Sequence, residues 1–153
     1  MEAQFKLLEL AQQNLAKQLD ALSIEQINTI PTGFNNNLVW NFAHIVSAIQ
    51  MLCYTRIGLP TRLDETFVHR YKLGTKPEAF VTADEYNIYK QYAATGIEKL
   101  KEDYANNHFK DFKPFTTSTG FEVDSIDYAI TYALFHHGIH TGYAMAIKKL
   151  VVQ

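Results

Sequence analysis

The sequence contains almost no cysteine, no excess of basic charge and no Glu-x-x-His pair. Cys53 is the only cysteine among 153 residues, which excludes an internal disulfide and leaves too little sulfur for a structural zinc knuckle. The formal net charge is −2, so nothing favours binding to phosphates, and we expect no nucleic-acid partner. A redox di-metal centre on a helical bundle is also excluded, because it needs inward carboxylates with Glu-x-x-His pairs, and the sequence has none.

The sequence also lacks a long uninterrupted apolar run. Its longest apolar stretch, 38–57, is interrupted by polar side chains at Asn41, His44, Ser47, Gln50 and Arg56. We therefore expect no transmembrane span and no membrane partner. Residues 1–6 have neither the basic region nor the apolar region of a signal peptide. Together with the single cysteine, this predicts a cytoplasmic location.

Apolar residues recur at three- and four-residue steps along much of the chain, which is the spacing of amphipathic helices. The predicted helices cover approximately residues 5–22, 24–28, 38–57, 86–104 and 125–150. Capping boxes at Ser23/Gln26 and Thr82/Glu85 start the second and fourth of these. Either Asn36 or Asn37 caps the third, and either Asp124 or Ser125 caps the last.

These helices predict an all-α fold, a four-helix bundle in a single domain that spans residues 1–153. Apolar residues make up 47% of the chain, which is enough for one core. Residues 59–82 show no sustained period, so we expect a long crossover loop between the second and third long helices. Residues 109–122 form a second loop with at most a short extended piece. The helix at 38–57 is apolar on nearly every side, which predicts a subunit interface on its outer flank and a homodimer.

Three histidines lie within five residues near the end of the chain, at His136, His137 and His140. On a helix His136 and His140 share one face with the apolar residues, whereas His137 lies about 100° to the side. His44 lies in the apolar helix at 38–57 and is a candidate third member. Buried separately, each imidazole needs a donor and an acceptor contact, and core carbonyls or hydroxyls can supply them. A shared divalent cation would instead take one lone pair from each imidazole, and both interpretations stay open.

Two motifs resemble those of the DinB superfamily (DinB/YfiT-like proteins). They are Asn-Leu-Val-Trp-Asn-Phe-Ala-His-Ile at 37–45 and His-x-x-x-His-x-Gly at 136–142, and the resemblance extends over essentially the whole chain. It implies a four-helix bundle, often dimeric, in which His44, His136 and His140 hold a nickel or zinc ion. The family members with known activities are thiol-dependent, so it also implies a low-molecular-weight thiol or another small substrate.

We therefore expect a metal-dependent enzyme of hydrolase or thiol-transferase type, with an open position on a three-histidine site. Imidazole suits zinc, nickel, copper and iron alike, so the sequence does not identify the metal. Asn41, His137 and Tyr143 are candidates for contacts beside the ligands. Relatives often have an acidic residue in place of His137 and glutamine in place of Tyr143, so no general-base role carries over to these two positions.

The alternative is a non-catalytic dimeric module that binds metal or another protein. It predicts a closed site, in which a side chain such as His137 or Glu122 fills the fourth position around the ion.

Overall fold

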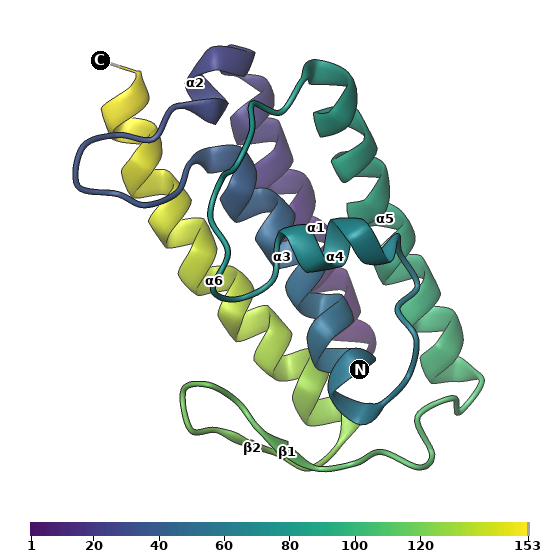
Figure 1. Ribbon diagram of the computed structural model, residues 1–153. Coiled ribbons are helices and arrows are strands. Elements are labelled where there is room, and N and C mark those ends of the chain that lie inside the picture. Colours follow the sequence, from purple (N-terminus) through teal and green to yellow (C-terminus); the bar gives the residue numbers. More distant parts are fainter. Residues whose placement is uncertain (153) are drawn as a thin grey trace.

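The computed structural model describes residues 1–152, and it is mostly helical, as expected for an all-α protein (Figure 1). Its elements are α1 (Glu2–Asp20), α2 (Ile24–Asn28), α3 (Leu38–Cys53), the 3₁₀ turn η1 (Thr55–Ile57), α4 (Glu65–Arg70), α5 (Ala83–Ala105), β1 (Phe115–Thr116), β2 (Glu122–Val123) and α6 (Ile126–Val151). The two short strands pair antiparallel, with Phe115 opposite Val123.

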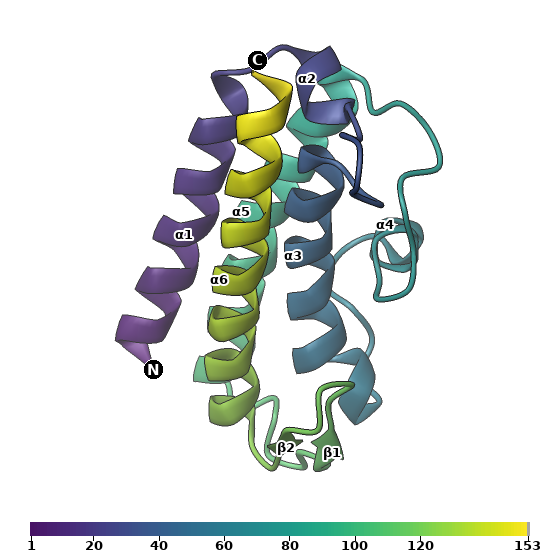
Figure 2. The same cartoon turned by 90° about the vertical axis from the view of Figure 1, so that its left-hand side faces the viewer.

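The long helices α1, α3, α5 and α6 lie side by side (Figures 1 and 2). Helix α6 packs against both α3 and α1, and α5 packs against the same two helices from the other side. The β1–β2 hairpin closes one end of the helices, whereas α2 lies at the opposite end, close to the end of α6 (Figure 2). A hydrogen bond from Gln26 Nε2 to the carbonyl of Val151 ties α2 to α6.

The helix starts follow the local capping chemistry of the sequence. The Ser23/Gln26 and Thr82/Glu85 capping boxes both form. Of the alternatives left open by the sequence, Asn37 caps α3 and Ser125 caps α6, each through a side-chain oxygen that accepts a backbone N–H. These caps satisfy N–H groups that would otherwise lack partners at the helix ends.

Helix α3 is the core of the molecule. Every residue from Leu38 to Gln50 is buried. By length and mean hydropathy the segment Leu38–Ile57 could cross a membrane, but 78% of the apolar window is buried inside the protein. The rest of the protein therefore covers the apolar surface of α3, as for a core helix of a globular protein.

The crossover segment is more ordered than the sequence predicted. It contains α4, which is capped by Asp64 and buries Phe67 and Val68. The hydroxyl of Ser47 on α3 donates a hydrogen bond of 2.8 Å to the carbonyl of Val68. The prediction of a loop throughout 59–82 was wrong here because a helix of six residues is too short to show a period. The outer flank of α3, which was expected to form a dimer interface, is covered by this segment of the same chain.

A partly buried carboxylate, that of Asp103, joins α5 to the end of α3 and to the crossover segment. Asp103 accepts hydrogen bonds from Arg62 Nε at 2.7 Å and from the hydroxyl of Tyr54 at 2.8 Å. Burial alone would raise the pKa of Asp103, but the hydrogen bonds from Arg62 and Tyr54 outweigh it and lower the pKa. Tyr54 is fully buried, so its bond to Asp103 also gives its side-chain hydroxyl a partner.

We expect Asp103→Asn to lower the free energy of unfolding at pH 7 by about 1–3 kcal/mol, because a charged hydrogen-bond acceptor is lost. The pKa of the folded carboxyl lies below that of the unfolded chain. Its stabilisation is therefore present above about pH 4 and is lost as the pH falls through the folded-state value. Urea unfolding between pH 7 and pH 3 should show the difference from the native protein shrinking on acidification. Asp111→Asn, at an exposed position, is the control, and a difference independent of pH would contradict the assignment.

Candidate metal centre

Three imidazoles from two distant stretches of sequence meet between α3 and α6. His44 lies midway along α3, and His136 and His140 lie one turn apart on α6. Their candidate ligand nitrogens all lie within 4.8 Å of one another, so this group could hold one metal ion. The ring of His140 is 4.5 Å from each of the other two rings, measured between centroids.

The hydrogen bond of His44 determines which of its nitrogens has a free lone pair. His44 Nδ1 lies 2.7 Å from the carbonyl oxygen of Tyr71. A carbonyl oxygen only accepts, so Nδ1 carries the hydrogen and Nε2 presents its lone pair. The acceptor is backbone in the segment just after α4, which means that the crossover segment orients this imidazole.

The same reasoning applies to His140. Its Nδ1 lies 2.9 Å from Oδ1 of Asn41. The amide nitrogen of Asn41 donates to the carbonyl of Asn37 at 2.8 Å and to Oδ1 of Asn36 at 3.0 Å, which identifies Oδ1 as the acceptor. His140 therefore carries its hydrogen on Nδ1 and presents Nε2 as a lone pair. Asn41, a candidate for a contact beside the ligands, thus bonds directly to one imidazole of the cluster.

The surroundings keep the imidazoles neutral. Burial lowers the pKa of His44. It also lowers the pKa of His136 to about 4 and that of His140 to about 3, with repulsion between neighbouring histidines adding to both shifts. Neutral imidazole is the form that binds metal ions. Within residues 1–152, Nε2 of His44 and of His140 and both ring nitrogens of His136 make no protein hydrogen bond. The donor set therefore fits a divalent cation.

Trp40 supports the cluster from the side. Its ring stacks on His44, with centroids 4.7 Å apart and planes only 8° from parallel. It also lies near His140, at 6.5 Å between centroids. This packing restricts rotation of the imidazole of His44, which is useful for a ligand that must keep one orientation.

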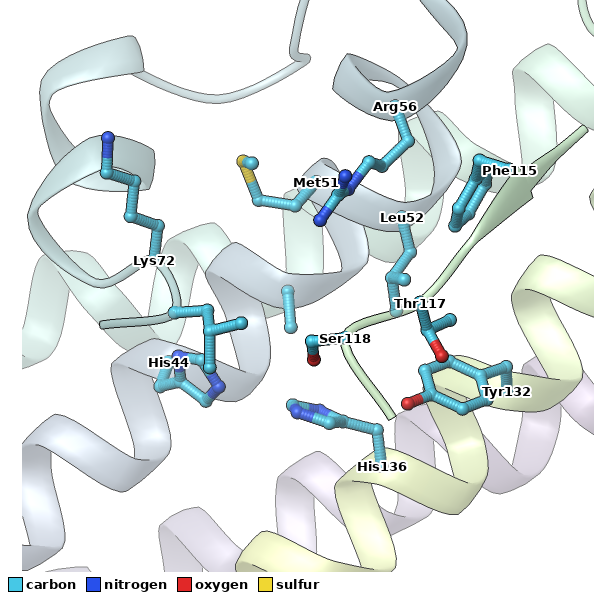
Figure 3. A pocket seen from close by; sticks show the side chains of 12 residues that line it. His44, Met51, Leu52, Arg56, Lys72, Phe115, Thr117, Ser118, Tyr132 and His136 are labelled. Atoms are coloured by element: carbon cyan, nitrogen blue, oxygen red, sulfur yellow. The ribbon is translucent and has the colours of Figure 1, made fainter. Parts of the chain in front are cut away.

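A cavity of about 90 Å³ reaches two of the three imidazoles (Figure 3). His44 and His136 line it, whereas His140 does not. Its walls come from α3, from the crossover segment, from α6 and from the chain around β1. The remaining lining residues are Ala48, Met51, Leu52, Arg56, Lys72, Leu73, Phe115, Thr117, Ser118 and Tyr132.

Two residues singled out in the sequence lie elsewhere. His137 was expected at the side of α6, but it is only 1% exposed, and Nδ1 lies 3.0 Å from the hydroxyl of Thr141. Helix α6 is covered by α1 as well as by α3, so a second flank of it is buried. Tyr143 was a candidate for a contact beside the ligands, but it is 40% exposed and packs edge-on against Phe34.

No further histidine, cysteine or carboxylate joins the cluster within residues 1–152. The group of candidate ligands contains His44, His136 and His140 alone, and Glu122 is exposed on β2. Sequence reasoning missed the carbonyl of Tyr71, which has no signature in a sequence because every residue has a carbonyl. It also missed Arg56 and Lys72, which no motif connects to the histidines.

Comparison with known proteins finds one family model and a solved structure that match this chain. The sequence model of a family described as "DinB superfamily" matches residues 7–144. A crystal structure described as the conserved protein of locus from Enterococcus faecalis has a similar fold, with a TM-score of 0.65 and 13% sequence identity. The match covers 99% of this chain and 96% of that one. No curated protein matches the sequence.

We expect His44 and His140 to be Nδ1–H tautomers in the metal-free protein. Asn41→Leu should remove this preference from His140 and leave His44 unchanged, because the carbonyl of Tyr71 stays in place. Long-range ¹⁵N–¹H NMR of the imidazoles measures both tautomers in one experiment. The same variant should weaken metal binding by about 10- to 100-fold. An Nε2–H tautomer of His140 in the native protein would contradict the assignment.

Proposed function

The chain belongs to the DinB superfamily, and on that premise we propose that it is a metal-dependent enzyme on a DinB-like four-helix bundle. His44, His136 and His140 are the proposed ligands of one divalent cation, either zinc or nickel. The proposed reaction is hydrolysis of, or thiol transfer to, a small substrate. A low-molecular-weight thiol is the proposed co-substrate in the second case. We also propose a single domain and a cytoplasmic location, where the buried thiol of Cys53 stays reduced.

The observation that carries the proposal is the cavity over His44 and His136. Catalytic zinc sites use three protein ligands and leave a position for water or substrate, whereas structural sites are closed by four. A cation held by the three imidazoles would act as a Lewis acid and lower the pKa of a water or thiol. The cavity lets such a small molecule reach the cluster from one side.

Other residues of the chain can position a substrate. The hydroxyl of Tyr132 lies 2.9 Å from that of Thr119 and lines the cavity beside His136. Ser118 lies at the same wall, near His136 in Figure 3. Cys53 is unsuited to the role of nucleophile, because it is fully buried and burial raises the pKa of its thiol to about 12.

The non-catalytic alternative requires a closed site. His137 and Glu122 were the side chains expected to close it, and neither lies in the cluster. The open side therefore favours the enzyme over a metal-binding or interaction module.

Metal analysis of protein purified without chelators tests the ligand set. We expect about one zinc or nickel ion per chain in the native protein, and loss of the ion in His44→Ala, His136→Ala and His140→Ala. His137→Leu is the matched control, since it removes a neighbouring buried imidazole outside the cluster. Stoichiometric metal in the three ligand variants would refute the assignment.

Activity assays separate the two functional interpretations. The metal-loaded native protein is assayed for hydrolysis of activated esters and for transfer of small thiols to electrophiles. Turnover in either assay that His140→Ala lacks supports the enzyme. Stoichiometric metal with no turnover in either assay supports the non-catalytic module.

We further propose that the protein is a homodimer and that the outer face of α6 forms the interface. Phe135 and Ile139 on this face are each 53% exposed. Cβ atoms added at Gly138 and Gly142 would meet no atom within 4 Å. A second copy could approach closely at these glycines and bury the apolar side chains, and a two-fold axis would bring the same face together from both copies. Helix α6 faces the viewer in Figure 2.

Ile139→Glu should convert such a dimer to a monomer, because it places a charge at the centre of the apolar face. Leu7→Glu on α1 is the matched control, at an apolar side chain that is 52% exposed. Analytical ultracentrifugation measures both. A monomeric native protein, or equal dissociation of the two variants, would contradict this interface.

A further inference from the structure

The cavity over the histidines has an uneven distribution of charge. Two cationic side chains line it, Arg56 and Lys72, and no carboxylate does. Neither cation forms an ion pair within residues 1–152, whereas Arg62 and Arg70 pair with Asp103 and Glu85. A cavity with cationic walls and no compensating acid attracts anions.

The guanidinium of Arg56 lies at the wall of the cavity. It belongs to η1, directly after α3, and its guanidinium carbon lies 6.0 Å from the ring centroid of Phe115 on β1. This cation–π contact restrains a long side chain that is otherwise exposed. In Figure 3 the guanidinium points into the cavity, whereas the amine of Lys72 points away from His44. Arg56 is therefore the cation that a bound molecule would meet, and Lys72 adds positive potential at the rim.

The surface between the imidazoles and Arg56 is mainly apolar. Met51 and Leu52 line the cavity from α3, and Leu73 lines it from the crossover segment. A molecule that spans this surface needs an apolar middle, a group that binds near the imidazoles at one end and an anionic group at the other.

We propose that Arg56 determines substrate specificity by binding a carboxylate of a small substrate. The planar guanidinium can donate two parallel hydrogen bonds to a carboxylate. The apolar part of the substrate lies against Met51 and Leu52, and the reactive end faces His44 and His136. Which group of the substrate reacts beside the imidazoles depends on the proposed function. The binding of the carboxylate by Arg56 does not require a metal.

Two probes of equal length test the preference for a carboxylate. They are 3-mercaptopropionate and its uncharged amide, 3-mercaptopropanamide. Each is titrated into cobalt(II)-loaded protein, and the thiolate-to-cobalt charge-transfer absorption reports binding. We expect the acid to bind about tenfold more tightly than the amide, the effect of one charge-assisted pair at a partly exposed site.

Variants assign that preference to one residue. Arg56→Gln should make the two dissociation constants equal by weakening the acid alone, and Arg56→Lys should keep part of the preference because it keeps the charge. Lys17→Gln is the control, since it removes a positive charge from an exposed position on α1 outside the cavity. Equal affinities of the two probes for the native protein, or an unchanged preference in Arg56→Gln, would overturn the proposal.

A second measurement separates this proposal from the metal site. The Nε–H resonance of Arg56 in ¹⁵N–¹H NMR should shift with the acid and stay unchanged with the amide, in cobalt-loaded and in metal-free protein alike. If the protein takes up no cobalt, the proposed metal function fails, and the shift of this resonance still decides the role of Arg56. An Nε–H resonance that does not shift with the acid in either the cobalt-loaded or the metal-free protein refutes that role.

Discussion

The candidate site depends on the orientation of two imidazoles, those of His44 and His140, by acceptors that cannot donate. The carbonyl of Tyr71 and Oδ1 of Asn41 each accept a hydrogen bond from the Nδ1–H of a histidine, at 2.7 and 2.9 Å. Both histidines therefore leave an Nε2 lone pair free at the cluster. Beside the imidazole of His136, these two free lone pairs form a set of neutral nitrogen donors that could hold one cation. Reversing either tautomer would turn a lone pair into an N–H and remove the reason for a metal to bind.

The connecting segments build the site as much as the long helices do. The segment between α3 and α5 covers α3 through α4, orients His44 through a backbone carbonyl and lines the cavity with Lys72 and Leu73. The chain around β1 forms the facing wall and holds the guanidinium of Arg56 against Phe115. The long helices bring the imidazoles together, and the connections decide what can reach them. This division is common in folds that place variable loops on a rigid scaffold.

Much of the helical structure and of the histidine cluster could be predicted from the sequence. The capping boxes at Ser23 and Thr82 mark helix starts, and the four-residue spacing of His136 and His140 places both rings on one face of α6. The prediction failed for α4, where six residues carry too little periodic signal. The helical wheel placed His137 at the side of α6, but it could not show that α1 covers this side, because a wheel measures only the angle around one helix. For the same reason it could not show that Tyr143 is 40% exposed.

The sequence by itself determined where the helices begin and which histidines share a face, because capping and helical periodicity are local properties of a few consecutive residues. Only the tertiary structure decided that His44 meets the pair on α6, that Tyr71 and Asn41 set the tautomers, and that Arg56 shares a cavity with the imidazoles. These contacts join residues up to 99 positions apart. They follow from the packing of whole helices and from the path of the chain between them, which no local pattern records.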